Sequence, residues 1–279
     1  MDLRQPDNLE FYENHWSRTS LADDQDVLGK AQQLLAMIPA SVRSIADVGC
    51  GDGTITRVLA EHYAVTAIDR SARALVRVSA HSPRVTCVQA SADALPFGAG
   101  QFDLVFSSEM LEHLPDAVLA GATRELQRVA KSWLLLSVPN GENIRRRYLR
   151  CAQCAFEFNI YGHLQSLDSA KLECLFAEFE VSASVESGPA EPPTLASIER
   201  FRQRFGERWF WWQGAQACCP RCLNNIFNVP KWHPGNRFAD KLADWLTDRW
   251  ISFTDQRVKP WWVTVLMRRG AGQLQGDNL

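Results

Sequence analysis

The strongest constraint on the fold is a regular alternation of short apolar runs and amphipathic segments between residues 44 and 140. The apolar runs are rich in Val, Ile and Leu, and they read SIADVGC, AVTAIDR, RVTCVQAS, FDLVFSSEM and SWLLLSVPN. Helical patterns lie between them; in ARALVRVSA, Ala74, Leu75 and Val78 keep the spacing of a buried stripe. Apolar strands that alternate with helices indicate βαβ units, in which helices cover both faces of a parallel sheet. The sequence therefore predicts an α/β fold whose ligand site lies at the carboxyl edge of the sheet.

The rest of the chain departs from this rhythm and predicts a division into parts. The predicted parts are an N-terminal helical cap over 1–43, a core over 44–188 and 258–270, and an insert over 189–257 that is rich in Trp and Cys. In the insert, RFADKLADWLTDRW predicts a helix, whose apolar face contains Phe238, Leu242, Trp245 and Leu246. Further aromatic residues of the insert are Trp209, Trp211, Trp212 and Trp232. We favour a small aromatic core for the insert over a platform for sugars or a wall for a lipid-linked substrate.

The charge balance argues against several classes of partner. The chain has 279 residues, with 30 Lys+Arg against 32 Asp+Glu and a formal net charge of −2, so no overall positive field attracts nucleic acid or an anionic membrane. A dense apolar run near the end, Trp261 to Met267, is far shorter than the ~20 residues that a membrane span requires. The first residues, MDLRQPDNLE, contain no apolar segment, so we expect no signal peptide and a cytoplasmic location.

The most informative motif is the loop DVGCGDG over residues 47–53, between a predicted strand and a predicted helix. Glycine lets a loop backbone approach a ligand closely and adopt conformations that other residues avoid. The spacing differs from the dinucleotide pattern G-x-G-x-x-G, because the third glycine comes one residue early. Asp69 ends the next strand, where a carboxylate can accept both hydroxyls of a ribose, and Asp93 follows the third strand at the same edge.

This loop, the two aspartates and the run FDLVFSSEMLEHLPD together resemble the class I S-adenosylmethionine-dependent methyltransferases, closest to their small-molecule branch. The resemblance covers about residues 44–140. It implies a Rossmann-like, seven-stranded, mostly parallel sheet with helices on both faces, in which WWVTVLMRR forms the last, antiparallel strand. It also implies S-adenosyl-L-methionine as the cofactor. The cofactor-binding residues implied in this way are Gly49, Gly51 and Gly53 for the methionine part, Asp47 for orienting the loop, Asp69 for the ribose and Asp93 for the adenine.

Candidate residues for the methyl acceptor follow from the same resemblance. The sulfonium already activates the methyl group, so the protein must align the acceptor and exclude water, and a poor nucleophile such as a hydroxyl also needs a base. His113 in LEHLPD resembles the family position that faces the methyl group, and His163 in IYGH is the second candidate. Glu109 is predicted to line the cofactor pocket or to stabilise its loop. In relatives an aromatic helix closes over the cofactor, and a similar segment here contains Phe11, Tyr12, His15 and Trp16.

Two C-x-x-C pairs predict a metal site. Cys151 and Cys154 form the first pair, Cys219 and Cys222 form the second, and a two-residue gap lets two thiolates bind one tetrahedral Zn²⁺. In the predicted fold both pairs follow strands at the carboxyl edge, so one structural Zn²⁺ would join two loops into a lid over the acceptor site. The alternatives are reduced thiol pairs or a redox switch, and Cys218 could replace Cys219 as a ligand.

A basic cluster lies beside the first cysteine pair and has two interpretations. Its members are Arg145, Arg146, Arg147 and Arg150. Such a run commonly solvates a helix face. At this edge of the sheet it could instead hold a phosphate or carboxylate of an anionic acceptor, because the guanidinium fork suits both groups.

Together these features predict an S-adenosylmethionine-dependent methyltransferase that acts on oxygen of a small-molecule or saccharide acceptor, in glycan or natural-product biosynthesis. One alternative is an RNA methyltransferase that grips RNA through the zinc insert, which the net charge of −2 disfavours. The other is a non-catalytic protein that binds cofactor or a partner. An oligomeric state is not predicted.

Overall fold

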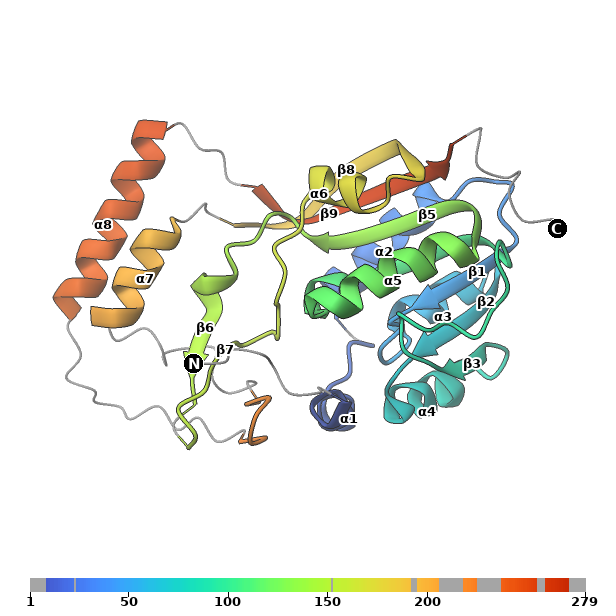
Figure 1. Ribbon diagram of the computed structural model, residues 1–279, viewed down its shortest axis with the longest axis horizontal. Helices are drawn as coiled ribbons and strands as arrows, with labels where there is room; N and C mark the ends of the chain where they lie inside the picture. The colour runs from blue at the N-terminus through green and yellow to red at the C-terminus, as the bar shows by residue number, and fades with distance from the viewer. Residues whose placement is uncertain are drawn as a thin grey trace.

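A computed structural model describes residues 9–22, 24–151, 153–191, 195–205, 218–224, 237–254 and 259–270. A central sheet with helices on both faces forms the body of the molecule, and a pair of helices lies to one side of it (Figure 1). The helices are α1 Leu9–Arg18, α2 Gln25–Met37, α3 Thr54–Ala60, α4 Ala72–His81, α5 Asp116–Val129, α6 Ser169–Leu175, α7 Ala196–Phe205 and α8 Arg237–Thr254.

The sheet has seven strands in the order β3-β2-β1-β4-β5-β9-β8. Its strands are β1 Ser44–Val48, β2 Ala64–Asp69, β3 Thr86–Gln89, β4 Phe102–Ser108, β5 Ala130–Pro139, β8 Phe179–Glu191 and β9 Lys259–Arg269. Neighbours from β3 to β5 pair in parallel, whereas β9 pairs antiparallel with both β5 and β8. The predicted seven-stranded, mostly parallel sheet with an antiparallel last strand is confirmed. The strand order reverses between β1 and β4, which is where open α/β sheets bind ligands at the carboxyl edge.

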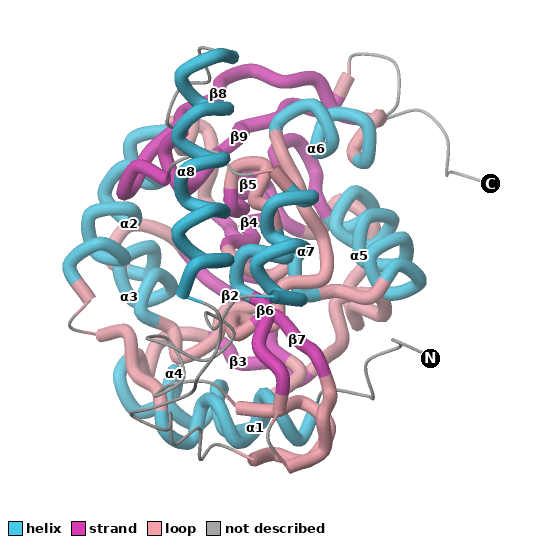
Figure 2. Tube along the Cα trace, turned by 90° about the vertical axis from the view of Figure 1, so that its left-hand side faces the viewer, coloured by secondary structure: helices cyan, strands magenta, loops and turns pink. Residues whose placement is uncertain are grey.

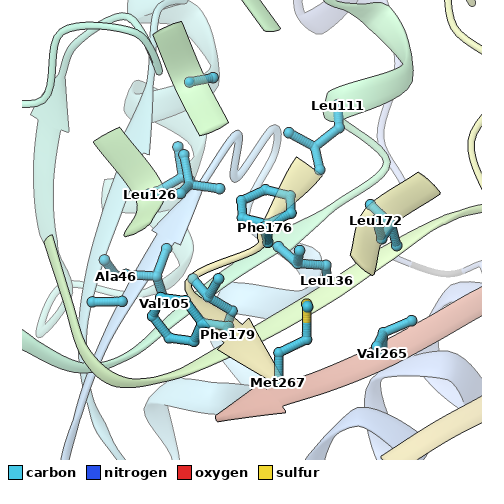
Figure 3. Packing of buried hydrophobic residues seen from close by; sticks show 14 of the residues in the cluster. Ala46, Val105, Leu111, Leu126, Leu136, Leu172, Phe176, Phe179, Val265 and Met267 are labelled. Atoms are coloured by element: carbon cyan, nitrogen blue, oxygen red, sulfur yellow. The ribbon is translucent and has the colours of Figure 1, made fainter. Parts of the chain in front are cut away.

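Helices cover both faces of this sheet and enclose an apolar core on each. Figure 2 shows α2 and α3 on one side and α5 and α6 on the other. On the first side Leu34 of α2 and Leu59 of α3 are buried in one cluster with strand residues. On the second side Leu126 of α5 and Phe176, directly after α6, are buried in another (Figure 3). Each such side chain contributes ~1.5–3 kcal/mol on burial, so the two clusters hold the strand ends in place.

The two helices of the predicted N-terminal cap have different surroundings. Leu34 and Ile38, in and directly after α2, pack in the same core cluster as Ile45 of β1, so α2 is part of the packed body. Helix α1 instead contacts α4 and the loops at the carboxyl edge. The predicted boundaries between the parts stay a prediction; strand β8 itself continues to Glu191, past the predicted core boundary at 188.

A short two-stranded ribbon extends the carboxyl edge. It consists of β6 Tyr148–Arg150 and β7 Glu157–Asn159, which pair antiparallel, and the first cysteine pair lies in the turn between them. Two short 3-10 helices precede it along the chain, η1 Leu111–His113 after β4 and η2 Ile144–Arg147 after β5. The first cysteine pair therefore lies at the tip of this ribbon, which follows β5 along the chain.

Helices α7 and α8 pack against each other at the left of Figure 1. Ala239 and Ala243 of α8, one turn apart, are 2% and 0% exposed. Phe238 and Trp245, from the predicted apolar face, are 71% and 54% exposed. Helix α8 therefore buries its alanine face and not the predicted aromatic one, while Trp209, Trp211, Trp212 and Trp232 lie outside the described residues. None of the helices in the described ranges has both the length and the apolar character that crossing a bilayer demands.

Candidate active site

The glycine loop between β1 and α3 adopts backbone conformations that favour glycine. Gly49, Gly51 and Gly53 all have positive φ angles, of 79°, 55° and 79°. A Cβ atom at Gly49 would lie 2.4 Å from Met110 Cγ, and one at Gly51 would lie 2.6 Å from the ring of Trp16. These positions therefore accept no larger side chain without displacement of a neighbour. The loop backbone therefore packs closely against Met110 and Trp16 at the carboxyl edge, and the close approach of a ligand stays a prediction.

Asp47, near the end of β1, fastens the strand to the helix that follows the loop. Its side chain is 2% exposed, and its Oδ2 accepts a hydrogen bond of 2.6 Å from the Thr56 hydroxyl in α3. Burial raises the pKa of Asp47 to about 7, against the opposing effect of the Thr56 hydrogen bond. The protonated and ionised forms of this carboxyl are therefore both populated near neutral pH, and a cation bound nearby would favour the ionised form.

Asp69, the last residue of β2, links the second strand to the glycine loop. Its Oδ2 accepts from the Gly51 backbone N–H at 3.0 Å, and its Oδ1 accepts from the Ser71 N–H at 2.8 Å. Burial raises the pKa of Asp69, and these two backbone donors oppose the rise. Each carboxylate oxygen keeps a second lone pair, so the side chain is held in position and can still accept hydrogen bonds from a ligand.

Asp93 lies in the loop after β3, at the same edge of the sheet as Asp69, because β2 and β3 are parallel neighbours. Its side chain is exposed and accepts from the Ser91 hydroxyl. Helix α5 comes very close to it: a Cβ atom at Gly121 would lie 2.6 Å from Asp93 Cβ. The two acids that the sequence assigned to ribose and adenine therefore share one rim of the sheet.

Helix α1 lies over the glycine loop and is also attached to the first turn of α4. Glu13 accepts hydrogen bonds from the backbone N–H groups of Ala72 and Arg73, at 2.7 and 3.3 Å, in the first turn of α4. These are donors that a helix leaves unpaired, so Glu13 caps α4 from another element. Trp16 packs on Gly51 from the same helix. In this conformation α1 covers the loop, as the resemblance implied for the aromatic segment.

His113 and His163 come together at the same edge from distant parts of the chain. Their ring centroids are 4.8 Å apart, and the ring of Tyr12 in α1 lies 6.1 Å from His113. Two backbone N–H groups, of Leu164 and Gln165, donate to the Glu112 carbonyl at 2.7 and 3.0 Å and hold the two segments together. Burial, followed by the neighbouring His163, holds the pKa of His113 well below its usual range. His113 is therefore a neutral imidazole at neutral pH.

Several buried polar atoms at this edge have no hydrogen-bond partner among the described residues. They include the hydroxyls of Tyr12 and Ser108 and both carboxylate oxygens of Glu112. A buried polar group without a partner is costly, so such a group marks a place where a ligand, an ion or water completes the site. Ser108 ends β4, Glu112 lies in η1 after it and Tyr12 of α1 lies near His113, so a polar ligand at the end of β4 would find partners in these groups.

Glu109 is held by an ion pair. Its Oε1 lies 2.9 Å from Nζ of Lys30 in α2, and that lysine is 3% exposed. The same ammonium lies 4.6 Å from the ring centroid of Trp262 in β9. Glu109 has a φ of 54°, which is uncommon for a residue other than glycine. Its contacts fit the predicted loop-stabilising role better than direct contact with a ligand.

The four predicted cysteine ligands form one cluster. Sγ of Cys151 lies 3.6 Å from Sγ of Cys222, Sγ of Cys154 lies 3.6 Å from Sγ of Cys219, and all four sulfur atoms lie within 4.8 Å of one another. Zinc–sulfur bonds of ~2.3 Å in a tetrahedron set the sulfur atoms ~3.8 Å apart, so this donor set fits Zn²⁺. Cys218 is outside the cluster and lies 4.0 Å from Nδ2 of Asn14 in α1.

The predicted arginine cluster splits in the structure. Arg150 is exposed, and Arg145 lies over the ring of Tyr148 at 5.7 Å. Arg147 points inward: its side chain is 10% exposed, and it donates to the Tyr161 hydroxyl at 3.0 Å. Its guanidinium also lies 4.8 Å from the ring centroid of Trp261. One arginine of the four therefore builds the wall beside His163.

Sequence reasoning missed three charged residues of this site: Lys30, Glu112 and Glu142. A signal existed for Lys30, which stands four residues before the core residue Leu34 on the buried face of α2. Glu112 is adjacent to His113 in LEHLPD, but the family resemblance points to His113 and gives no signal for Glu112. Glu142, which binds Nδ1 of His163, lies in a loop without periodicity, so only the tertiary structure reveals it.

Comparisons with known proteins agree with this geometry. Residues 45–132 match the family model described as a methyltransferase domain. The chain is 39% identical over 98 residues to an uncharacterized methyltransferase of Synechocystis sp., covering 35% of this chain and 45% of that protein. It is 37% identical over 110 residues to a malonyl-[acyl-carrier protein] O-methyltransferase of Herminiimonas arsenicoxydans, covering 38% and 40%. The chain thus spans less than half the length of these relatives.

A solved structure extends the likeness beyond the matched domain. The N-methyltransferase NodS from Bradyrhizobium japonicum WM9, in complex with S-adenosyl-L-homocysteine, superposes with a TM-score of 0.55 at 21% identity, covering 66% of this chain and 93% of that chain. At this identity the likeness shows the fold. The chain therefore contains a methyltransferase domain over residues 45–132, and its fold is that of this solved methyltransferase.

The raised pKa of Asp47 predicts a pH dependence of stability. Between the ~3.9 of an unfolded Asp and the native value of about 7, only the native state keeps this proton. The Asp47 carboxyl therefore makes its full contribution to the free energy of unfolding below pH ~4. This contribution is lost as the pH rises to 7, by at most ~1.4 kcal/mol per pH unit. Asp47→Asn, which can still accept from Thr56, should remove this slope.

Urea unfolding at several pH values between 4 and 8 measures this pH dependence. The quantity compared at each pH is the difference in unfolding free energy between wild type and Asp47→Asn. Asp26→Asn, at an exposed position in α2, is the matched control and should parallel wild type. A wild-type slope that survives the Asp47 change intact would contradict the assignment.

Proposed function

We propose that this protein is an S-adenosylmethionine-dependent methyltransferase that methylates oxygen of a small-molecule acceptor. One observation carries the proposal: within a methyltransferase domain, the glycine loop, Asp69 and Asp93 share the carboxyl edge of the sheet. In this proposal Gly49, Gly51 and Gly53 line the methionine part of the cofactor, Asp47 orients the loop, Asp69 accepts from the ribose and Asp93 contacts the adenine.

For this reaction the protein must align the acceptor with the methyl group, exclude water and remove one proton from the acceptor hydroxyl. S-adenosyl-L-methionine supplies a methyl group that its sulfonium already activates. Helix α1 covers the loop through Trp16 and so excludes water from the reacting atoms. His113 and His163 border the acceptor side, where an imidazole can accept the proton of a hydroxyl. Glu142 binds Nδ1 of His163 and leaves Nε2 free to face the acceptor.

Two features support an oxygen acceptor on a small molecule. The name of the Herminiimonas relative describes an O-methyltransferase, and a hydroxyl is the kind of acceptor that needs a base beside it. The rings of Tyr161 and Trp261 lie 5.6 and 6.4 Å from His163, and Arg147 lies over both rings. Aromatic faces with a cation between them suit a saccharide-like or anionic acceptor from glycan or natural-product biosynthesis, which is the finer form of the proposal.

The four-cysteine cluster is proposed to hold one structural Zn²⁺. Four thiolates close the coordination sphere, so the ion would take no part in methyl transfer. It would join the β6–β7 turn to residues 219–222, which follow β8 along the chain. Cys218, beside this cluster, contacts Asn14 of α1. The ion would therefore support the helix that covers the cofactor site.

The ribose assignment predicts the effect of Asp69→Ala on cofactor binding. Loss of a carboxylate that accepts ribose hydroxyls should weaken binding of S-adenosyl-L-methionine by roughly tenfold or more, since hydrogen bonds to a charged group contribute ~1.5–3 kcal/mol. Isothermal titration calorimetry measures the Kd, and circular dichroism checks that the variant is folded. Asp26→Ala, at an exposed site, should bind like wild type. An unchanged Kd for a folded Asp69→Ala would remove the ribose role.

The zinc assignment predicts a difference between neighbouring cysteines. Cys151→Ser should lower the zinc content from about one equivalent per chain and lower the thermal midpoint, because a ligand is lost. Cys218→Ser should keep the full zinc content, since its sulfur is outside the cluster. Elemental analysis of the purified proteins measures both. Wild-type protein that purifies without metal yet is fully active would contradict the structural role.

A further inference from the structure

A second group of possible ligands lies apart from the cysteines, on the acceptor side of the proposed methyl-transfer site. Glu112, His113 and His163 each offer one ligand atom, and these atoms all lie within 4.8 Å of one another. Glu112 and His113 come from η1 at the end of β4, and His163 comes from the loop after β7. Bonds of ~2.0–2.2 Å from one ion to nitrogen and oxygen place its ligand atoms at most ~4.4 Å apart, which is close to the 4.8 Å limit of this cluster.

The buried carboxylate of Glu112 is the group in this cluster that lacks a partner. It is 1% exposed, and neither carboxylate oxygen has a hydrogen-bond partner among the described residues. Nε2 of His113, a neutral imidazole, lies 3.9 Å from Oε1, beyond hydrogen-bond distance. The neighbouring Lys30 ammonium is paired with Glu109 at 2.9 Å. A buried carboxylate without donors is costly, and a bound cation would satisfy both oxygens.

The surroundings of His163 have the arrangement that metal-binding imidazoles use. Nδ1 of His163 is bound to a carboxylate oxygen of Glu142, and both side chains are at most 5% exposed. Arg147 Nε lies 3.6 Å from the other oxygen of Glu142 and holds this carboxylate in place. In a metal site such a carboxylate fixes the tautomer and orientation of the ring and leaves Nε2 to bind the ion. His163 therefore already has the carboxylate partner that a metal-binding imidazole commonly uses.

We propose that Glu112, His113 and His163 bind one divalent cation. Two imidazoles and one carboxylate suit a transition metal such as Mn²⁺, Fe²⁺ or Zn²⁺ better than Mg²⁺ or Ca²⁺, which prefer sites made of oxygen alone. Three protein ligands leave positions open for water or a substrate oxygen, in contrast to the closed four-cysteine cluster. The two sites differ in donor chemistry and in the elements that build them.

The consequence for the acceptor rests on the proposed methyltransferase function. A cation here would bind an acceptor through its oxygen atoms and make its hydroxyl more acidic. The hydroxyl proton would leave to solvent, the O–CH₃ bond would form as the S–CH₃ bond breaks, and the electron pair of that bond would stay on sulfur. The ion would then replace the imidazole base described under the proposed function, since the two imidazoles would hold the ion and not accept the proton. Acceptors with two adjacent oxygen atoms would be preferred, because they can chelate.

Manganese binding tests the site without cofactor or acceptor. Protein with its cysteine cluster loaded with zinc is titrated with Mn²⁺, and electron paramagnetic resonance measures the free ion. Wild type should bind about one equivalent, and Glu112→Gln and His163→Gln should each weaken binding at least tenfold. The matched controls are Glu61→Gln and His62→Gln, both at exposed positions, and they should bind like wild type.

A second measurement uses wild-type protein, in case a buried variant does not fold. Bound Mn²⁺ should broaden the imidazole NMR signals of His113 and His163 and leave the signal of His62 sharp. Absence of binding by wild type, equal binding by folded Glu112→Gln, or equal broadening at all three histidines would each overturn the proposal. The manganese experiments are done without cofactor. If the protein failed to bind S-adenosyl-L-methionine in a separate experiment, that would count against the methyltransferase function and would not affect the conclusion about the metal site.

Discussion

The structure depends on the hydrogen bond from the Gly51 N–H to the carboxylate of Asp69. It joins the loop after β1 to the end of β2, and Gly51 makes it from a left-handed backbone conformation that favours glycine. The same carboxylate caps the turn into α4 through Ser71. One side chain thus sets the relative position of two loops at the carboxyl edge, and the proposed cofactor site includes both of those loops.

The outer layer of the site depends on this edge in turn. Helix α1 is held by Glu13, which caps the first turn of α4, and rests on Gly51 through Trp16. The next residue along the helix, Asn14, meets Cys218 beside the cysteine cluster. The segment that carries the second cysteine pair, the first turn of α4 and the glycine loop therefore all contact one covering helix. A change at the cysteines would reach the cofactor side through α1 and leave the sheet intact.

The sequence predicts the sheet well because its signals are local and repeated. Apolar strands, the glycine spacing and the strand-end acids each lie within a few residues, and parallel packing brings them to one edge. The pairing of Cys151 with Cys222 and the contact of His113 with His163 depend on tertiary structure, although the motifs named those residues. Glu142 and Lys30 gave weaker signals, because one lies in an irregular loop and the other in an amphipathic helix. The aromatic face of α8 misled, since the small alanines allow close packing and are buried in its place.

Hydrogen–deuterium exchange with and without S-adenosyl-L-methionine tests the central claim most directly, because it reports where the cofactor acts on the unaltered protein. The account predicts slower exchange of backbone N–H groups in residues 49–53 and 69–72 and in α1, with no change in α8. Exchange that is the same with and without cofactor in both loops, or protection confined to α8, would contradict it.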